Sequence, residues 1–158
     1  MDERDKQRLL DLFTIRRVAT LAVMVDEAPF ASLVPFATTP DFGAALIHAS
    51  TLARHSAGLI AGAPFSFLIH EPDEQADHNP SQLGRVTLTG SVDPLDRDSE
   101  ASASARDLYL AKFPKSAMTF QLGDFTLYSL QIETARFVAG FAKTFDLSQF
   151  ELHDLAKG

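Results

Sequence analysis

Runs of apolar residues separated by turn residues extend along most of this chain and predict a series of short strands. Val18–Val25 is rich in β-branched residues and apolar on both faces, which is typical of a strand inside a barrel or at an interface. Asp26–Pro29 predicts a tight turn, so Phe30–Thr38 should return antiparallel. Pro35 within that run indicates an edge or bulge position, because proline cannot donate a hydrogen bond to a neighbouring strand.

The rest of the chain predicts further strands with helices inserted between them. The other predicted strands are Ala44–His48, Pro64–His70, Gly84–Val92, Phe125–Ile132 and Arg136–Phe141. The predicted helices are Asp2–Phe13, Thr51–Ala61 with Ser50 or Thr51 as N-cap, and a helix from Asp98 or Ser99 to Phe113, followed by a helical turn at Ser116–Gln121. The tail from Asp146 is amphipathic or irregular. This order of six to seven strands differs from strand–helix alternation and favours a mainly β, antiparallel barrel with helical insertions.

Length and charge narrow the classes of protein. The 158 residues fit a single domain over residues 1–158, and an apolar content of 46% is enough for a core. The formal net charge is −7 and the basic residues are scattered, which argues against a nucleic-acid partner. The sequence has no cysteine, so disulfides, thiolate catalysis and thiolate metal sites are excluded.

The beginning of the chain and its apolar runs bear on localisation. Met1–Lys6 is densely charged and has no apolar signal-peptide core. No apolar run approaches the roughly 20 residues that a helix needs to cross a bilayer. We therefore expect a cytoplasmic protein with no membrane partner.

The segment Ser50–Ser56 is the strongest candidate for ligand chemistry. It places a hydroxyl, the basic side chains of Arg54 and His55, and the first N–H groups of the predicted helix within a few residues. Several donors that converge on one dianion are what phosphate binding requires. The alternative is an ordinary capped helix with solvated Arg54 and His55.

Other polar groups are open to two interpretations. Arg85, on the polar face of its strand, faces either an anionic ligand or solvent. The acidic loop Glu71–His78 is either a hard-cation site or a solvated loop, and it lacks the ordered spacing of a calcium loop. No pair among the five histidines has the spacing of a zinc-protease helix, and a haem ligand among them is possible in principle. We assign no metal ligand, no catalytic acid or base, and find no partner for Asp124 in a paired-carboxylate mechanism.

Several blocks of residues, taken in order, match the pattern of a known family. They are Ala19–Ala22, Pro29–Phe36, Ser50–Leu59, Ser66–Ile69, Arg85–Gly90, Tyr109–Pro114, Gly123–Tyr128 and Ala135–Phe141. On these motifs the chain resembles the pyridoxamine 5′-phosphate oxidase-like FMN-binding split-barrel superfamily, most of all its haem-utilisation branch. The resemblance implies a split β-barrel of antiparallel Greek-key type, a homodimer, and two FMN molecules at the subunit interface.

The resemblance also implies which residues hold the cofactor. Ser32, Leu33, Val34 and Pro35 would lie along the flavin ring; His48 and Ser50 would lie beside the ribityl–phosphate arm; Leu52, Arg54 and His55 belong to the phosphate-binding segment; and Arg85 would contact FMN from the other subunit. The implied function is that of an FMN-dependent oxidoreductase acting on a small-molecule substrate. The alternatives are a haem-binding or haem-degrading split-barrel protein and a non-catalytic dimeric binding module.

Overall fold

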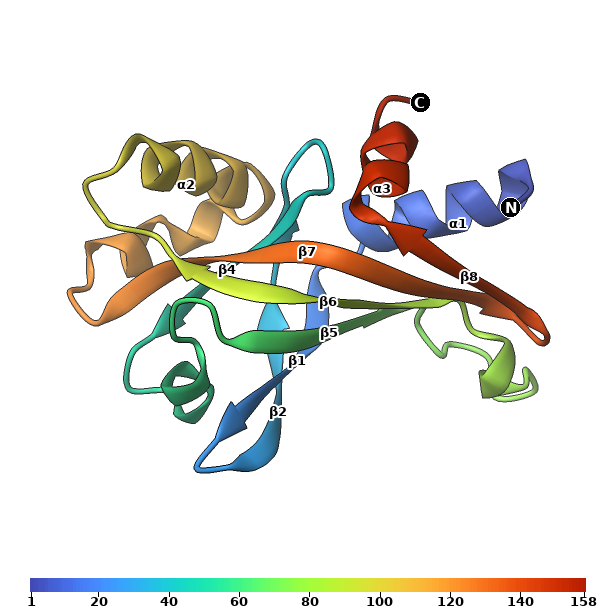
Figure 1. Ribbon diagram of the computed structural model, residues 1–158, viewed down its shortest axis with the longest axis horizontal. Coiled ribbons are helices and arrows are strands. Elements are labelled where there is room, and N and C mark those ends of the chain that lie inside the picture. Colours follow the sequence, from blue (N-terminus) through green and yellow to red (C-terminus); the bar gives the residue numbers. More distant parts are fainter.

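The protein, described here over residues 1–158 by a computed structural model, is built on one curled antiparallel sheet (Figure 1). The strands are β1 (Val18–Val25), β2 (Ala28–Pro35), β3 (Ala37–Thr38), β4 (Ala44–Ser50), β5 (Pro64–His70), β6 (Arg85–Pro94), β7 (Phe125–Gly140) and β8 (Lys143–Ser148). The helices are α1 (Glu3–Thr14), α2 (Glu100–Lys112) and α3 (Gln149–Ala156), with 3₁₀ turns η1 (Arg54–Gly58), η2 (Pro80–Gln82) and η3 (Pro114–Gln121). The strand order is β2-β1-β5-β6-β7-β4-β3, with β8 on β7, and the mainly β split-barrel prediction is confirmed.

The sheet curls because its two outermost strands are consecutive in the chain. β2 and β3 lie at opposite ends of the strand order, yet only Phe36 separates them. Phe36 is fully buried, and its ring meets the ring of Phe67 edge-to-face at 5.4 Å between centroids. The Phe36 N–H donates to the carbonyl of Arg17 just before β1. The bend at Phe36 therefore brings the two edges of the sheet together around the core.

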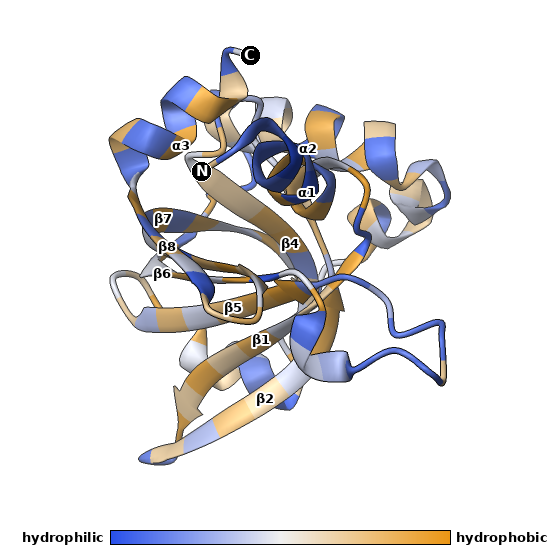
Figure 2. Cartoon of the chain, turned by 90° about the vertical axis from the view of Figure 1, so that its right-hand side faces the viewer, coloured by the Kyte–Doolittle hydropathy of each residue, from blue (hydrophilic) through white to orange (hydrophobic).

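Two hydrophobic clusters fill the molecule. The larger one occupies the interior of the curled sheet and includes the inner side of α1, where Leu9, Leu12 and Phe13 are buried. The smaller one lies beneath α2, where Tyr109 and Phe113 pack on β4 and β7. Because it has the barrel interior on one face and α2 on the other, β4 is buried along most of its length. β1 is also mostly hydrophobic, as its colouring in Figure 2 shows.

The hairpin of β1 and β2 agrees with its sequence. Val25 pairs with Ala28, so Asp26 and Glu27 form a two-residue turn, and both have positive φ (51° and 61°), as turns that match the twist of a hairpin require. β2 is an edge strand that pairs on one side only, with β1. The edge position predicted from Pro35 is therefore confirmed.

The helix predicted over Thr51–Ala61 is wrong. Only Arg54–Gly58 is helical, and it is a single 3₁₀ segment whose N-cap, Ala53, has no side-chain hydrogen bond. Ser50 still belongs to β4, so neither Ser50 nor Thr51 is the N-cap. Contact with β1 keeps the segment short: a Cβ on Gly58 would lie 2.5 Å from the carbonyl oxygen of Met24.

The last third of the chain differs from the prediction in two ways. The two predicted strands Phe125–Ile132 and Arg136–Phe141 are one strand, β7, which ends at Gly140, because the polar residues between them make a bulge at Glu133 rather than a strand end. The tail contains β8 and α3, which were not predicted; α3 begins at a capping box in which Ser148 and Glu151 bind each other's backbone N–H groups. The sheet therefore has eight strands rather than six to seven.

A half-buried ion pair fastens α1 to the barrel. Arg8 donates through Nε and Nη2 to both carboxylate oxygens of Glu71, at 2.7 and 2.6 Å, and through Nη1 to the carbonyl of Ala139. Glu71 also accepts from the N–H of Gly84 at 2.6 Å. The hydrogen bonds from Arg8 hold the pKa of Glu71 below its ordinary value. Glu71, predicted as part of a solvated loop or cation site, thus joins α1, β6 and the loop after β5.

Acid should weaken this attachment in a way that depends on Glu71. A carboxylate with a lowered pKa in the folded state contributes stability above its unfolded pKa, and this stability is lost as the pH falls through the folded pKa. We expect Glu71→Gln to reduce stability at neutral pH by about 1–3 kcal/mol, because it breaks a charge-assisted pair. The variant should also lose less stability than the wild type between roughly pH 5 and pH 3.

The measurement is urea unfolding at a series of pH values. Glu3→Gln is the matched control, because Glu3 forms an exposed pair with Lys6 and such pairs contribute little. If acid reduces the free energy of unfolding equally in the wild type and in Glu71→Gln, the acid sensitivity does not come from Glu71.

None of the three α-helices has the length and apolar character that crossing a bilayer demands.

Candidate functional site

The centre of the predicted cofactor site is a hydrogen bond between β2 and η1. The hydroxyl of Ser32 lies 3.0 Å from Nδ1 of His55, and both side chains are half-buried. The other ring nitrogen of His55, Nε2, is buried without a hydrogen-bond partner. Burial lowers the pKa of His55, so the imidazole is neutral at pH 7. The ring thus has one nitrogen engaged with Ser32 and one unused.

Arg54 lies beside this pair on the outer surface. Its guanidinium is 3.9 Å from the carboxylate of Asp26 in the β1–β2 turn and 5.5 Å from the ring centroid of Phe30. Both charged side chains are largely exposed, and exposed pairs of this length contribute little to stability. Arg54 is therefore held loosely over β2 and retains donors for an anion.

Large apolar side chains at the β2 edge and before η1 have no cover in the single chain. Leu33 on β2 is 69% exposed and Leu52, just before η1, is 85% exposed, whereas Val34 points into the core. Pro35 is also exposed at the end of β2. Exposed apolar groups gathered on an edge strand mark a contact surface. Because side chains alternate along a strand, Leu33 and Pro35 lie on the opposite side of β2 from Phe30 and Ser32, so the apolar groups and Arg54 lie on two sides of one edge strand.

Ser50 does not join this group. Its hydroxyl donates to the carboxylate of Asp124 at 2.7 Å and accepts from the N–H of Leu52 at 3.1 Å. The N–H of Thr51 also donates to the carbonyl of Asp124. The Ser50 hydroxyl therefore anchors the chain at the end of β4. The carboxylate of Asp124 occupies the position beside Ser50 at which the phosphate was expected. Asp124, for which the sequence indicated no partner in a paired-carboxylate mechanism, accepts a hydrogen bond from Ser50 instead.

His48 lies in a different pocket, on the outer face of β4 beneath η3. Its ring stacks on the ring of Phe120, with 3.7 Å between centroids and 5° between planes, and Nδ1 lies 3.2 Å from the hydroxyl of Thr119. Burial, together with the charges of Arg97 and Arg106, lowers the pKa of His48 to about 4. The imidazole is therefore neutral across the physiological range.

Arg85 is remote from Ser32 and His55 within one chain. It begins β6, which is separated from β2 by β5 and β1. Its guanidinium donates to the carbonyls of Ser81 and Leu83, at 3.3 and 3.2 Å. Arg85 meets the other predicted residues only if a second copy supplies it.

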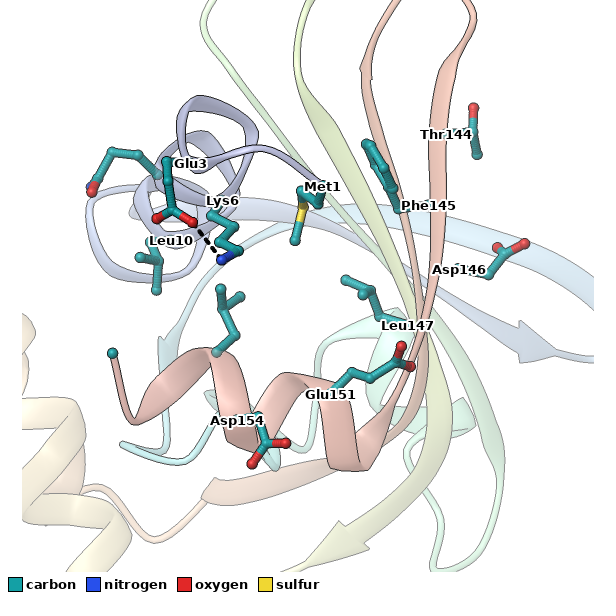
Figure 3. A pocket seen from close by; sticks show the side chains of 13 residues that line it. Met1, Glu3, Lys6, Leu10, Thr144, Phe145, Asp146, Leu147, Glu151 and Asp154 are labelled. Carbon is teal, nitrogen blue, oxygen red and sulfur yellow. Dashed lines mark hydrogen bonds and ion pairs between the residues drawn. The ribbon is translucent and has the colours of Figure 1, made fainter.

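A large groove lies elsewhere in the chain, between α1, β8 and α3 (Figure 3). Its volume is about 870 Å³, and it holds none of the predicted site residues. The acidic groups along it are already engaged: Glu3 pairs with Lys6, Asp146 with Arg136, Asp154 with Lys157, and Glu151 caps α3. The groove therefore offers no free charged group around which to build a site.

Sequence reasoning did not find the groups that surround the predicted residues. Phe30 and Asp26 lie close to Arg54, and Arg97, Arg106 and Phe120 surround His48. Each belongs to a different element from the residue it accompanies, so no spacing along the chain could indicate the contact. The sequence predicted the helical turn at Ser116–Gln121, which is η3, but not the contact of Phe120 with His48.

Comparison with known proteins agrees with this fold. The family model described as "CREG, beta-barrel" matches residues 6–151. Among solved structures, a heme binding protein from Mycobacterium smegmatis superposes with a TM-score of 0.80 at 24% identity over 98% of this chain. The heme storage protein HutZ from Vibrio cholerae gives 0.70 at 23% over 80% of the chain and 89% of its own length. ChuZ from Campylobacter jejuni gives 0.79 at 18% over 96%. No curated protein matches the sequence.

These similarities establish the fold, because the identities are too low to transfer an activity. The chain spans 61% of the M. smegmatis protein and 62% of ChuZ. Other similar structures are described as binding FAD together with haem, at 20% identity and a TM-score of 0.65, or FAD, at 15% identity and 0.57. The fold thus has both haem-binding and flavin-binding neighbours.

Proposed function

The chain belongs to the CREG β-barrel family, within the FMN-binding split-barrel superfamily, and from that premise we propose that it is a homodimeric flavoprotein that binds FMN and transfers electrons to or from a small molecule. The observation that carries the proposal is the pairing of Ser32 with His55 next to Arg54 on an uncovered apolar edge strand. Ser32 and His55 come from separate segments of the chain, and folding alone brings them together.

The residues along the β2 edge offer groups for the parts of FMN. Arg54 offers a mobile cation for the phosphate on the side of β2 that carries Phe30 and Ser32. Leu33 and Pro35 offer an apolar surface on the opposite side of the same strand. Ser50 is engaged by Asp124 and would support the segment rather than touch the phosphate.

The homodimer is part of the same proposal. The exposed Leu33 and Leu52 need cover, and Arg85 lies three strands away from β2 in its own chain. A second copy that packs on the β2 edge would cover the leucines and bring its own Arg85 to the cofactor. When bound, the isoalloxazine supplies the electron transfer. The protein holds it, orients it and limits the access of water.

Titration with FMN tests this proposal. We expect the protein to retain or take up FMN, measured by absorbance and by quenching of flavin fluorescence, and to sediment as a dimer. Arg54→Gln with His55→Gln should weaken FMN binding by about tenfold or more, because charge-assisted hydrogen bonds to the phosphate are lost.

Arg4→Gln is the matched control, because it removes one exposed positive charge on α1, away from β2. Titration with FAD in parallel separates the two flavins. A colourless protein that takes up neither flavin would overturn the proposal.

A second candidate function, haem binding, rests on His55. Imidazole is a common iron ligand, and structural neighbours are described as haem-binding and haem-storage proteins. Binding through His55 requires η1 to move, because its unpaired Nε2 is buried. Haem titration should then produce a Soret band that His55→Ala abolishes and that His78→Ala, in the exposed loop after β5, leaves unchanged. A stable dimer that binds neither haem nor flavin would instead indicate a non-catalytic binding module.

A further inference from the structure

A separate cavity, on the side of β4 that faces away from the barrel interior, carries two arginines. It lies between the end of β6, α2, η3 and the start of β7, and its volume is about 220 Å³. Arg97, Arg106 and His48 line it, together with Ser102, Phe120 and Phe125. None of the residues that line it is acidic, although the chain has 21 Asp and Glu residues and a net charge of −7.

Neither arginine has a carboxylate partner. All eight ion pairs of the protein involve other cations. Arg106 makes no hydrogen bond to the protein and is held by its position 5.2 Å from the ring centroid of Phe120. Arg97 donates through Nη2 alone to the carbonyls of Leu122, Gly123 and Phe125, which leaves its Nε and Nη1 unused. Two guanidinium groups thus retain free donors at one cavity.

The two arginines act together on His48. The positive charges of Arg97 and Arg106 help to lower the pKa of His48, because they disfavour a further positive charge on its ring. The carboxylate of Asp124, the acidic group adjacent in sequence to Gly123 and Phe125, is taken up by Ser50 at 2.7 Å. Ser102 is nearly buried, and its hydroxyl has no partner within the protein, so it is a further donor.

We propose that this cavity binds a small oxyanion, the phosphate or carboxylate group of a small organic molecule, independently of flavin. Guanidinium groups recognise both oxyanions through paired N–H donors, and a hydroxyl and a neutral imidazole complete a polar wall opposite aromatic rings. The site goes beyond the proposed flavoprotein function, because it requires neither the cofactor nor the β2 face.

The size of the cavity limits the ligand. A volume of about 220 Å³ is below the roughly 300–1,000 Å³ of sites that enclose drug-sized ligands. A haem macrocycle exceeds this volume, whereas a phosphate or a single-ring carboxylate does not. The rings of Phe120 and Phe125 provide an apolar wall for the organic part of such a ligand.

Calorimetric titration of the protein at low ionic strength, with inorganic phosphate and with benzoate, tests the proposal. We expect saturable binding of at least one anion, no binding of benzyl alcohol, and a shift of the His48 ring signals in the NMR spectrum. Arg106→Gln should weaken the binding by about tenfold, and Arg106→Lys should restore part of it, because lysine keeps the charge but not the paired donors.

Arg4→Gln again serves as the matched control, because it removes the same charge from an exposed position on α1. Binding of phosphate alone would assign the site to phosphoryl compounds, and binding of benzoate alone would assign it to carboxylates. Absence of binding by both anions, or an equal loss in Arg4→Gln, would overturn the proposal.

Repeating the titration with FMN-saturated protein separates this site from the flavin site. Unchanged anion binding supports an independent cavity. Competition between FMN and the anion would mean that the cavity belongs to the flavin site, and would overturn the proposal while leaving the flavoprotein proposal intact. Failure to bind FMN has no bearing on the anion titration of the protein alone.

Discussion

Gly90→Ala is expected to reduce the free energy of unfolding by about 3 kcal/mol or more, because the added methyl group has no space. A Cβ at Gly90 would lie 1.8 Å from the carbonyl oxygen of Gln131, far inside van der Waals contact. That oxygen belongs to the backbone of β7, so no rotation of a side chain can relieve the clash. Gly90 also sits at the bulge where the register of β6 and β7 shifts, between Thr89 and Gly90.

Urea unfolding followed by circular dichroism measures this effect. Gly123→Ala is the matched control, because a Cβ at Gly123 meets nothing within 4 Å and its φ is not positive. The control should change stability by no more than about 0.5 kcal/mol, as is usual at exposed positions. Equal stability of the two variants would mean that β6 and β7 do not approach as described.

Phe36→Ala is expected to reduce the free energy of unfolding by about 3–5 kcal/mol, the usual range for deleting a buried aromatic ring. Phe36 is fully buried at the bend between β2 and β3, where its ring contacts Phe67 and lies 4.4 Å below the ammonium of Lys112. Loss of the ring removes packing between the two edges of the sheet as well as apolar burial. We therefore expect Phe36→Ala to reduce the hydrogen-exchange protection of β2 and β3 more than that of β6 and β7, relative to the wild type.

Phe141→Ala deletes the same ring at a position that is 84% exposed, in the turn between β7 and β8, and serves as the control. It should leave stability within about 0.5 kcal/mol of the wild type. If Phe36→Ala destabilises no more than Phe141→Ala, the bend is not what closes the barrel.

The strands could be predicted from the sequence because each depends on a local pattern. β1 and β5 appear with their bounds as predicted, since β-branched and aromatic runs between turn residues specify extended structure by themselves. The edge position of β2 could also be predicted, because the missing N–H of Pro35 is a property of that residue alone. The family resemblance rested on the order of such local blocks, which is why it gave the split-barrel fold.

The errors fall where a distant contact overrides the local pattern. The segment after Ser50 contains helix-forming residues, yet Asp124 and β1 hold it from both sides and leave only the 3₁₀ turn of Arg54–Gly58. Glu133 and its neighbours are as polar as a loop, but pairing with β6 on one side and β8 on the other keeps β7 continuous through a bulge. The polarity of one segment does not show which neighbouring strands form hydrogen bonds with its backbone.

The sequence by itself determined that this chain forms an antiparallel β fold with hydroxyl, guanidinium and imidazole groups near residues 50–55. Only the tertiary structure decided which groups meet: His55 pairs with Ser32, Ser50 with Asp124, and His48 with Phe120 beside Arg106. The physical reason is that strand alternation assigns a side chain to a face but not to a neighbour across it. Those neighbours come from segments 23 to 74 residues away, which the curl of the sheet brings together.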